Sequence, residues 1–127
     1  MAIKRPRPRR EDFTIGRICP LPLEYAAAKD VLDDLYDEST EHTTGRIHNH
    51  EVVIACLPAG QIGTNEAAAA FSRMISAFPS LRAGFLVGIA GGVPSAKADI
   101  RLGDVVISQP EGSHGGVVQY AFAPRGG

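Results

Sequence analysis

Several features that this sequence lacks exclude whole classes of protein. Its 127 residues contain two cysteines, Cys19 and Cys56, and neither belongs to a CxxC motif. Both lie in apolar runs, so we interpret them as small core residues of a protein in a reducing compartment. This pattern argues against a disulfide framework and against a zinc site.

The sequence also has no apolar run of 18 residues, so it gives no support for a membrane span. Its basic start continues into Glu11 and Asp12, where a secretory signal would have an apolar core. We therefore expect a cytoplasmic protein without membrane contact.

Positive charge is scarce outside the N-terminus. Five of the 13 basic residues lie in the first ten residues, so the remaining chain has eight basic and 14 acidic side chains, a formal charge of -6. Nucleic-acid binding depends on neutralising phosphates with Lys and Arg, so nucleic acid is not an expected partner. The proline-rich start cannot form a helix and has little to bury, which predicts a flexible basic tail over residues 1–12.

Helical and strand-like segments alternate along residues 13–127, which predicts an α/β domain with a mixed sheet. The chain has no closing helix after its last expected strands, so we expect these residues to be the N-terminal portion of a larger, here truncated, domain. The expected elements are a strand over 13–19, a helix from about Pro22 to Tyr36, two strands within 43–57 that turn at His48, Asn49 and His50, a helix over 64–78, an apolar strand from Ala83, and strands over 105–109 and 115–122.

The apolar strand from Ala83 runs directly into a glycine-rich turn. A strand buried on both faces is expected to be continuously apolar, as this one is. Gly88, Gly91 and Gly92 lack the Cβ atoms that would keep a ligand from the backbone, although they are also compatible with a simple tight turn.

Three loops are expected at the carboxyl edge of the sheet, over residues 20–24, 58–64 and 88–94, where ligands of α/β sheets bind. Glu24 is the one titratable acid among them. An acid in the first turn of a helix is favoured for structural reasons alone. A carboxylate there also suits a base that accepts a proton from water, and the residues by themselves leave both interpretations open.

Other site chemistries find little support. The histidines lack ligand spacing, and no Walker loop or GxGxxG fingerprint is present, so neither a metal nor a cofactor is expected. Asp104 stands at a strand start, where it is predicted to fix a turn by accepting backbone hydrogen bonds.

Four motifs in order resemble the nucleoside phosphorylase and nucleosidase superfamily. They are IGRICPLPLEYAAAK at 15–29, CLPAGQIGTNEAAAA at 56–70, VGIAGGVPS at 87–95 and DIRLGDVVIS at 99–108. The chain looks most like the phosphorylase-type N-terminal domain of fungal NACHT and ankyrin-repeat proteins. The resemblance implies a three-layer α/β/α sandwich with a central mixed sheet, which cleaves the bond between ribose and a purine base.

The resemblance also assigns site residues. Glu24 matches the glutamate that activates water in nucleosidases. The substrate-binding positions that match the motifs are Pro20, Leu21, Ile62, Gly63, Ile89, Ala90 and Gly91.

The sequence departs from the family pattern in three ways. Ile89 stands where nucleosidases commonly have a serine, and the loop from Gly60 to Gly63 has one extra residue. The general acid and the main ribose-binding acid of the family belong to the second half of the fold, beyond this chain.

Two functions therefore stay open at this stage. One is cleavage of the N-glycosidic bond of purine nucleosides or nucleotides, by water or phosphate. The other is a catalytically inactive purine-binding or signalling module. The three loops contain no arginine to hold phosphate, which favours water, although Arg46 or Arg101 could reach in. A homo-oligomer is possible, because an uncovered sheet edge encourages association.

Overall fold

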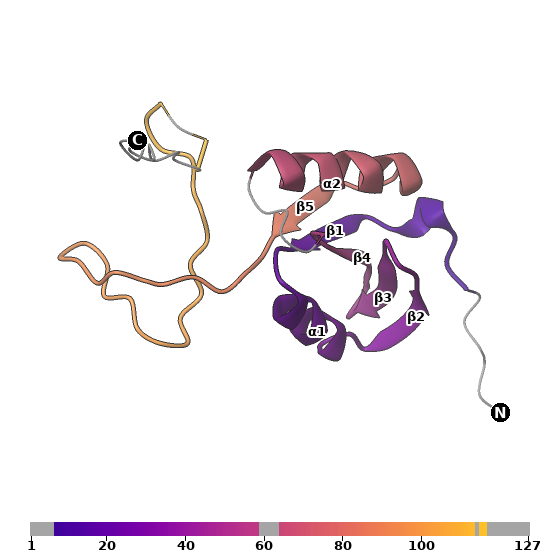
Figure 1. Ribbon diagram of the computed structural model, residues 1–127, viewed down its shortest axis with the longest axis horizontal. Coiled ribbons are helices and arrows are strands. Elements are labelled where there is room, and N and C mark those ends of the chain that lie inside the picture. Colours follow the sequence, from indigo (N-terminus) through magenta and orange to yellow (C-terminus); the bar gives the residue numbers. More distant parts are fainter. Residues whose placement is uncertain (1–6, 59–63, 114, 117–127) are drawn as a thin grey trace, which may run out of the picture. The chain divides into compact units, whose positions relative to one another are not determined.

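The computed structural model describes residues 7–58, 64–113 and 115–116 (Figure 1). Its internal contacts divide the chain into residues 1–90 and residues 91–127. The strands and α-helices of the described part all belong to the first of these units.

A five-stranded mixed sheet forms the centre of the first unit. Its strand order is β2-β3-β4-β1-β5. The strand β1 runs parallel to both of its neighbours, β4 and β5. The strand β3 runs antiparallel to its neighbours, β2 and β4. The strands are β1 Ile15–Cys19, β2 Asp34–Glu38, β3 Thr43–Ile47, β4 His50–Cys56 and β5 Ala83–Leu86.

One helix packs on each face of this sheet, as Figure 1 shows. The helix α1, Pro22–Asp30, contributes Ala28 to a buried cluster with Cys19, Val52 and Ile54. The helix α2, Thr64–Ala77, covers the opposite face. The predicted three-layer α/β/α arrangement is confirmed.

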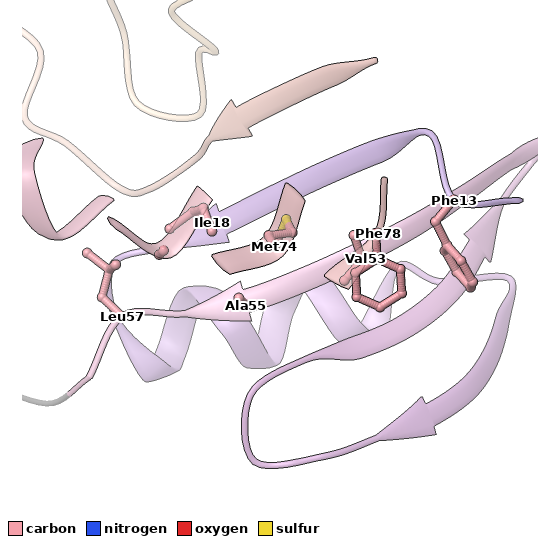
Figure 2. Close-up of a cluster of buried hydrophobic side chains, with 8 residues drawn as sticks. Phe13, Ile18, Val53, Ala55, Leu57, Met74 and Phe78 are labelled. Carbon is pink, nitrogen blue, oxygen red and sulfur yellow. The ribbon is translucent and has the colours of Figure 1, made fainter. Parts of the chain in front are cut away.

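The larger core lies between α2, β1 and β4. Figure 2 shows its side chains spread along the two strands, from Leu57 at one end to Phe13 at the other. Ile18, Val53 and Met74 are completely buried at its centre. Each such side chain contributes about 1.5–3 kcal/mol of transfer free energy relative to an exposed one.

The first helix is shorter than predicted. It ends at Asp30, and residues 34–38, expected to continue the helix to Tyr36, form β2. Backbone pairing explains the difference, because Asp33 donates its N–H to the Arg46 carbonyl and β2 pairs with β3. Leu35, expected on the buried helical stripe, is exposed.

The hairpin between β3 and β4 is confirmed, but the residue with left-handed backbone geometry is not the expected Asn49. His48 has the left-handed φ of 56°, and Asn49 does not. The Asp33 carboxylate accepts a hydrogen bond from the His48 N–H at 2.7 Å, which helps hold this conformation.

The second helix matches its predicted range and most of its predicted stripe. Ala67, Ala70 and Met74 are buried, whereas Ile75 is exposed and was wrongly assigned to the core. The ring of Phe71 takes the space that a Cβ at Gly84 would occupy, at 2.5 Å. Small residues in the sheet therefore allow this helix to approach closely.

The strand β5 was predicted correctly, but its burial was not. Every residue of β5 is exposed, including Phe85 and Leu86. The apolar run was expected to be covered on both faces. In the described residues β5 has β1 on one side and lies at the end of the sheet.

The second unit contains turns and extended chain among its described residues. Residues 105–109, predicted as a strand, form none and are exposed. The predicted strand at 115–122 lies mostly outside the described residues. Asp104 does close a turn, since its carboxylate accepts the Arg101 N–H at 2.9 Å and its own N–H donates to the Arg101 carbonyl.

The described part of the basic tail contacts other residues of the first unit. Residues Arg10–Asp12 form one turn of 3-10 helix, the Arg10 guanidinium stacks over Phe78, and Arg7 donates to the Tyr36 carbonyl at 3.1 Å. Residues 1–6 lie outside the described part, and the flexibility of the tail stays a prediction.

Candidate functional site

Glu24 is a buried acid in the first turn of α1. Pro22 begins this helix, where the missing proline N–H needs no intrahelical partner. Two residues later, the Glu24 Oε1 atom accepts a hydrogen bond from the backbone N–H of Leu21 at 2.7 Å. Glu24 is 5 % exposed although it is charged, and this local bond satisfies one of its oxygens.

The second oxygen of Glu24 binds a distant segment. Its Oε2 atom accepts a hydrogen bond from the backbone N–H of Ile89, 65 residues further along the chain. A Cβ atom at Gly88 would collide with the same carboxylate, so glycine is required there for this approach. The carboxylate therefore joins the loop after β1 to the loop after β5, which helix capping alone does not require.

The parallel pairing of β1 and β5 explains why these loops meet. Because parallel neighbours end at the same edge, Cys19 and Leu86 deliver both loops to one place. The helix that carries Glu24 is held in turn by a hydrogen bond between the hydroxyls of Tyr25 and Thr43 and by an ion pair from Lys29 to Glu38 at 3.1 Å.

Two thiols lie within electrostatic reach of this carboxylate. Burial raises the pKa of Cys19 and of Cys56, and the negative charge of Glu24 raises both further. The Arg17 guanidinium beside Cys19 acts in the opposite direction and partly lowers the pKa of that thiol. Glu24 is thus close to the ends of both β1 and β4.

Arg17 is a further charged residue near this site that was not predicted, because it lies within an apolar strand. Its Nε atom is buried and has no hydrogen-bond partner in the described part of the chain. A signal was present, because Arg17 is the one charged residue in the segment IGRIC and alternates with Cys19 on one face of the strand.

The remaining predicted site residues are only partly brought together. Pro20 is half-buried, whereas Leu21, Ile89 and Ala90 are exposed. Leu21 and Ile89 donate their N–H groups to the Glu24 carboxylate, and Ala90 follows Ile89 in the chain. Ile89 contributes a backbone donor, while its side chain is 76 % exposed. Gly91 belongs to the second unit, and Ile62 and Gly63 lie outside the described residues.

With this geometry established, the chain was compared with known proteins. The model of the phosphorylase superfamily matches residues 14–126, which is most of the sequence. The chain belongs to the phosphorylase superfamily. The resemblance inferred from the four motifs is confirmed at this level.

One relative of this chain is a nucleotide-binding leucine-rich repeat (NLR)-like protein from Hyaloscypha variabilis. The two are 45 % identical over 132 residues, which cover 98 % of this chain and 13 % of the relative. The chain thus spans about an eighth of that protein's length. No solved structure matches the phosphorylase superfamily chain.

The arginines considered as phosphate ligands have other partners in this superfamily member. Arg46 binds the Asp34 carboxylate at 2.6 Å and lies opposite Glu51, at the end of the sheet away from Glu24. Arg101, in the second unit, pairs with Asp99 at 2.8 Å.

No three His, Cys, Asp or Glu side chains of the described part of the chain gather in a way that would hold a metal ion. Neither of its helices is long and apolar enough to cross a bilayer. Two hollows, of about 170 and 320 Å³, have linings that do not include Glu24.

Proposed function

We propose that this chain is the N-terminal portion of a domain that cleaves the N-glycosidic bond of purine nucleosides or nucleotides. Membership of the phosphorylase superfamily supports the class of reaction. The observation that carries the assignment of a base is the Glu24 carboxylate, which is buried and bound to the backbone of two loops.

In this proposal Glu24 accepts a proton from water. The water oxygen forms a bond to the anomeric carbon of ribose while the bond from that carbon to the purine nitrogen breaks. Each carboxylate oxygen retains an acceptor site besides the one used by Leu21 or Ile89. These two amides orient the carboxylate before the substrate arrives, which removes a reorganisation cost from the reaction.

The leaving purine requires a proton from a separate acid, because negative charge develops on it while the ribose becomes positively charged. The described residues supply no second acid bonded into these two loops. We therefore assign the acid to a part of the longer protein outside this chain. In the NLR-like relative, the region that matches this chain is 13 % of the whole protein.

A binding or signalling module without turnover is the alternative function. Ile89 favours it, because an exposed aliphatic side chain beside the carboxylate donates no hydrogen bond to a water or phosphate. The relative from Hyaloscypha variabilis is an NLR-like protein, which is compatible with a signalling role for this chain.

The test uses the longer protein that contains this chain, incubated with adenosine, AMP or ATP, with free base measured by chromatography. The Glu24→Gln variant should release base about 10²- to 10⁴-fold more slowly, because a positioned base typically contributes that much. Glu66→Gln is the matched control, since Glu66 lies in the first turn of the other helix. It should retain the wild-type rate.

Equal rates for wild type and Glu24→Gln would remove the assigned role of Glu24. If neither wild type nor variant releases base, melting curves test the alternative module. A purine that raises the melting temperature supports it, because a ligand that binds the folded state stabilises that state by mass action. A chain that neither releases base nor responds to any purine contradicts both functions.

A further inference from the structure

The two cysteines, far apart in the sequence, meet at the carboxyl edge of the sheet. Cys19 is the last residue of β1 and Cys56 the last of β4, and they are direct partners in the register of these parallel strands. Neighbouring strands lie about 4.8 Å apart. That spacing is within the range of about 4.4–6.8 Å between the Cα atoms of disulfide-bonded cysteines.

Both thiols also point to the same face of the sheet. Direct partners in a ladder project their side chains to one side. Cys19 belongs to the buried cluster on the α1 face, together with Val52 and Ile54, which lie four and two residues before Cys56. The Leu57 N–H donates to the Cys19 carbonyl at 3.0 Å, so the two backbones are still bonded where the strands end.

The two sulfur atoms differ in access to solvent. Cys19 is completely buried, whereas Cys56 is half-buried. A small oxidant can therefore reach Cys56 before it reaches Cys19.

The surroundings of Cys19 suit a thiol that reacts second. Burial raises the pKa of the Cys19 thiol, and the Arg17 guanidinium beside it partly offsets this by favouring the thiolate, which is the nucleophile in disulfide chemistry. Arg17 also has a buried donor atom without a partner in the described part of the chain.

We propose that Cys19 and Cys56 form a peroxide-sensitive modification site, which closes to a reversible disulfide. Hydrogen peroxide, or another small peroxide, is the oxidant. The proposal is independent of the proposed function, because it requires no nucleoside chemistry. It differs from a structural disulfide framework, since both cysteines are free in this structure.

The reaction has two balanced steps. The Cys56 thiolate attacks one peroxide oxygen, the O–O bond breaks, and a sulfenic acid forms as water leaves. The Cys19 sulfur then attacks the Cys56 sulfur, the S–S bond forms, the S–O bond breaks, and a second water leaves. Two thiols lose two electrons in total and one hydrogen peroxide is reduced to two waters. Two small-molecule thiols then reduce the protein disulfide to the two free cysteines and form a disulfide of their own.

Closure would act directly on the Glu24 loops. Cys19 precedes Pro20 and Leu21, and the Leu21 N–H binds the Glu24 carboxylate. Because each cysteine is the last residue of its strand, a movement that brings the sulfur atoms together acts on the loops that follow β1 and β4.

The test oxidises the folded chain with hydrogen peroxide, blocks remaining thiols, and maps peptides by mass spectrometry without reduction. We expect the two free thiols of each chain to be lost together, with an intramolecular Cys19 to Cys56 peptide that dithiothreitol removes. Unchanged thiols, disulfides between chains, or Cys56 oxidised while Cys19 stays free would each overturn the proposal.

Two variants test the order of the steps. In Cys19→Ser, the Cys56 sulfenic acid should persist and accept dimedone, with complete loss of the disulfide. In Cys56→Ser, the buried Cys19 should remain a free thiol under the same exposure. Oxidation of Cys19 in that variant at the wild-type rate contradicts the proposed access through Cys56. Circular dichroism checks that both variants fold, and the wild-type mapping decides the proposal if one does not.

Discussion

The two strands that flank β1 have the same direction and similarly apolar sequences, but opposite surroundings. In β4, Val52, Val53 and Ile54 are at most 3 % exposed. In β5, Phe85 and Leu86 are each more than half exposed. Both strands pair with β1 in parallel, so backbone pairing does not cause the difference.

The difference arises from what lies on the far side of each strand. β4 continues into β3 and β2 and is covered by one helix on each face. β5 has no further strand in the described residues. An apolar run therefore predicts that a strand forms, whereas its burial depends on segments elsewhere. The β4 side supplies stability, while the open β5 side delivers Gly88 and Ile89 to Glu24.

The sharpest test of this comparison is Ile54→Ala in β4. Ile54 is fully buried, so the change removes buried methyl groups and leaves a cavity. We expect the free energy of unfolding to fall by about 2–5 kcal/mol, measured by urea denaturation. A loss below about 1 kcal/mol would show that the β4 side is less tightly packed than the structure indicates.

Gly88→Ala should have the next largest effect, on the β5 side. The new Cβ atom would collide with the Glu24 carboxylate, which must move and lose its bonds to Leu21 or Ile89. Leaving such buried groups unpaired costs about 1–3 kcal/mol. Gly91→Ala is the matched control, because nothing lies within 4 Å of its Cβ position. Equal unfolding free energies for the two variants would contradict the contact.

His42, on the β4 side, gives a prediction for acid pH. Burial lowers its pKa below the ordinary 6.5, Arg10 and Arg73 lower it further, and Glu41 partly opposes them. The unfolded chain then binds a proton more readily than the folded one as pH falls. The contribution of uncharged His42 to the stability of the fold is complete above pH 6.5. It is lost as the pH falls through the lowered pKa of His42.

Denaturation at a series of pH values checks this expectation. His42→Gln should reduce the loss of stability between about pH 6.5 and pH 5, the range in which histidine ordinarily titrates. His50→Gln is the control, since His50 is exposed at the hairpin. An unchanged slope in His42→Gln would show that another group causes the acid sensitivity.

The smallest effect is expected for Leu86→Ala in β5. The Leu86 side chain is 55 % exposed, so its truncation removes little buried surface. We expect the free energy of unfolding to change by less than about 1 kcal/mol in this chain. A loss as large as that of Ile54→Ala would mean that β5 is covered in solution and that the comparison between the two sides fails.

The sequence by itself determined the local elements and the family. Pro22 predicted the start of a helix, and the small residues of α2 predicted close packing. The glycine after β5 predicted that another group comes close to the backbone there, and in the structure this group is the Glu24 carboxylate. These features follow from backbone stereochemistry and residue size, which act over a few neighbouring positions.

Only the tertiary structure decided which distant groups meet. It turned residues 34–38 into a strand because β3 offered hydrogen-bond partners, and it left β5 exposed. It also placed the Ile89 amide on Glu24 and Cys56 beside Cys19. Such contacts depend on strand order and register, which are set by the free energy of the whole fold, so no short stretch of sequence specifies them.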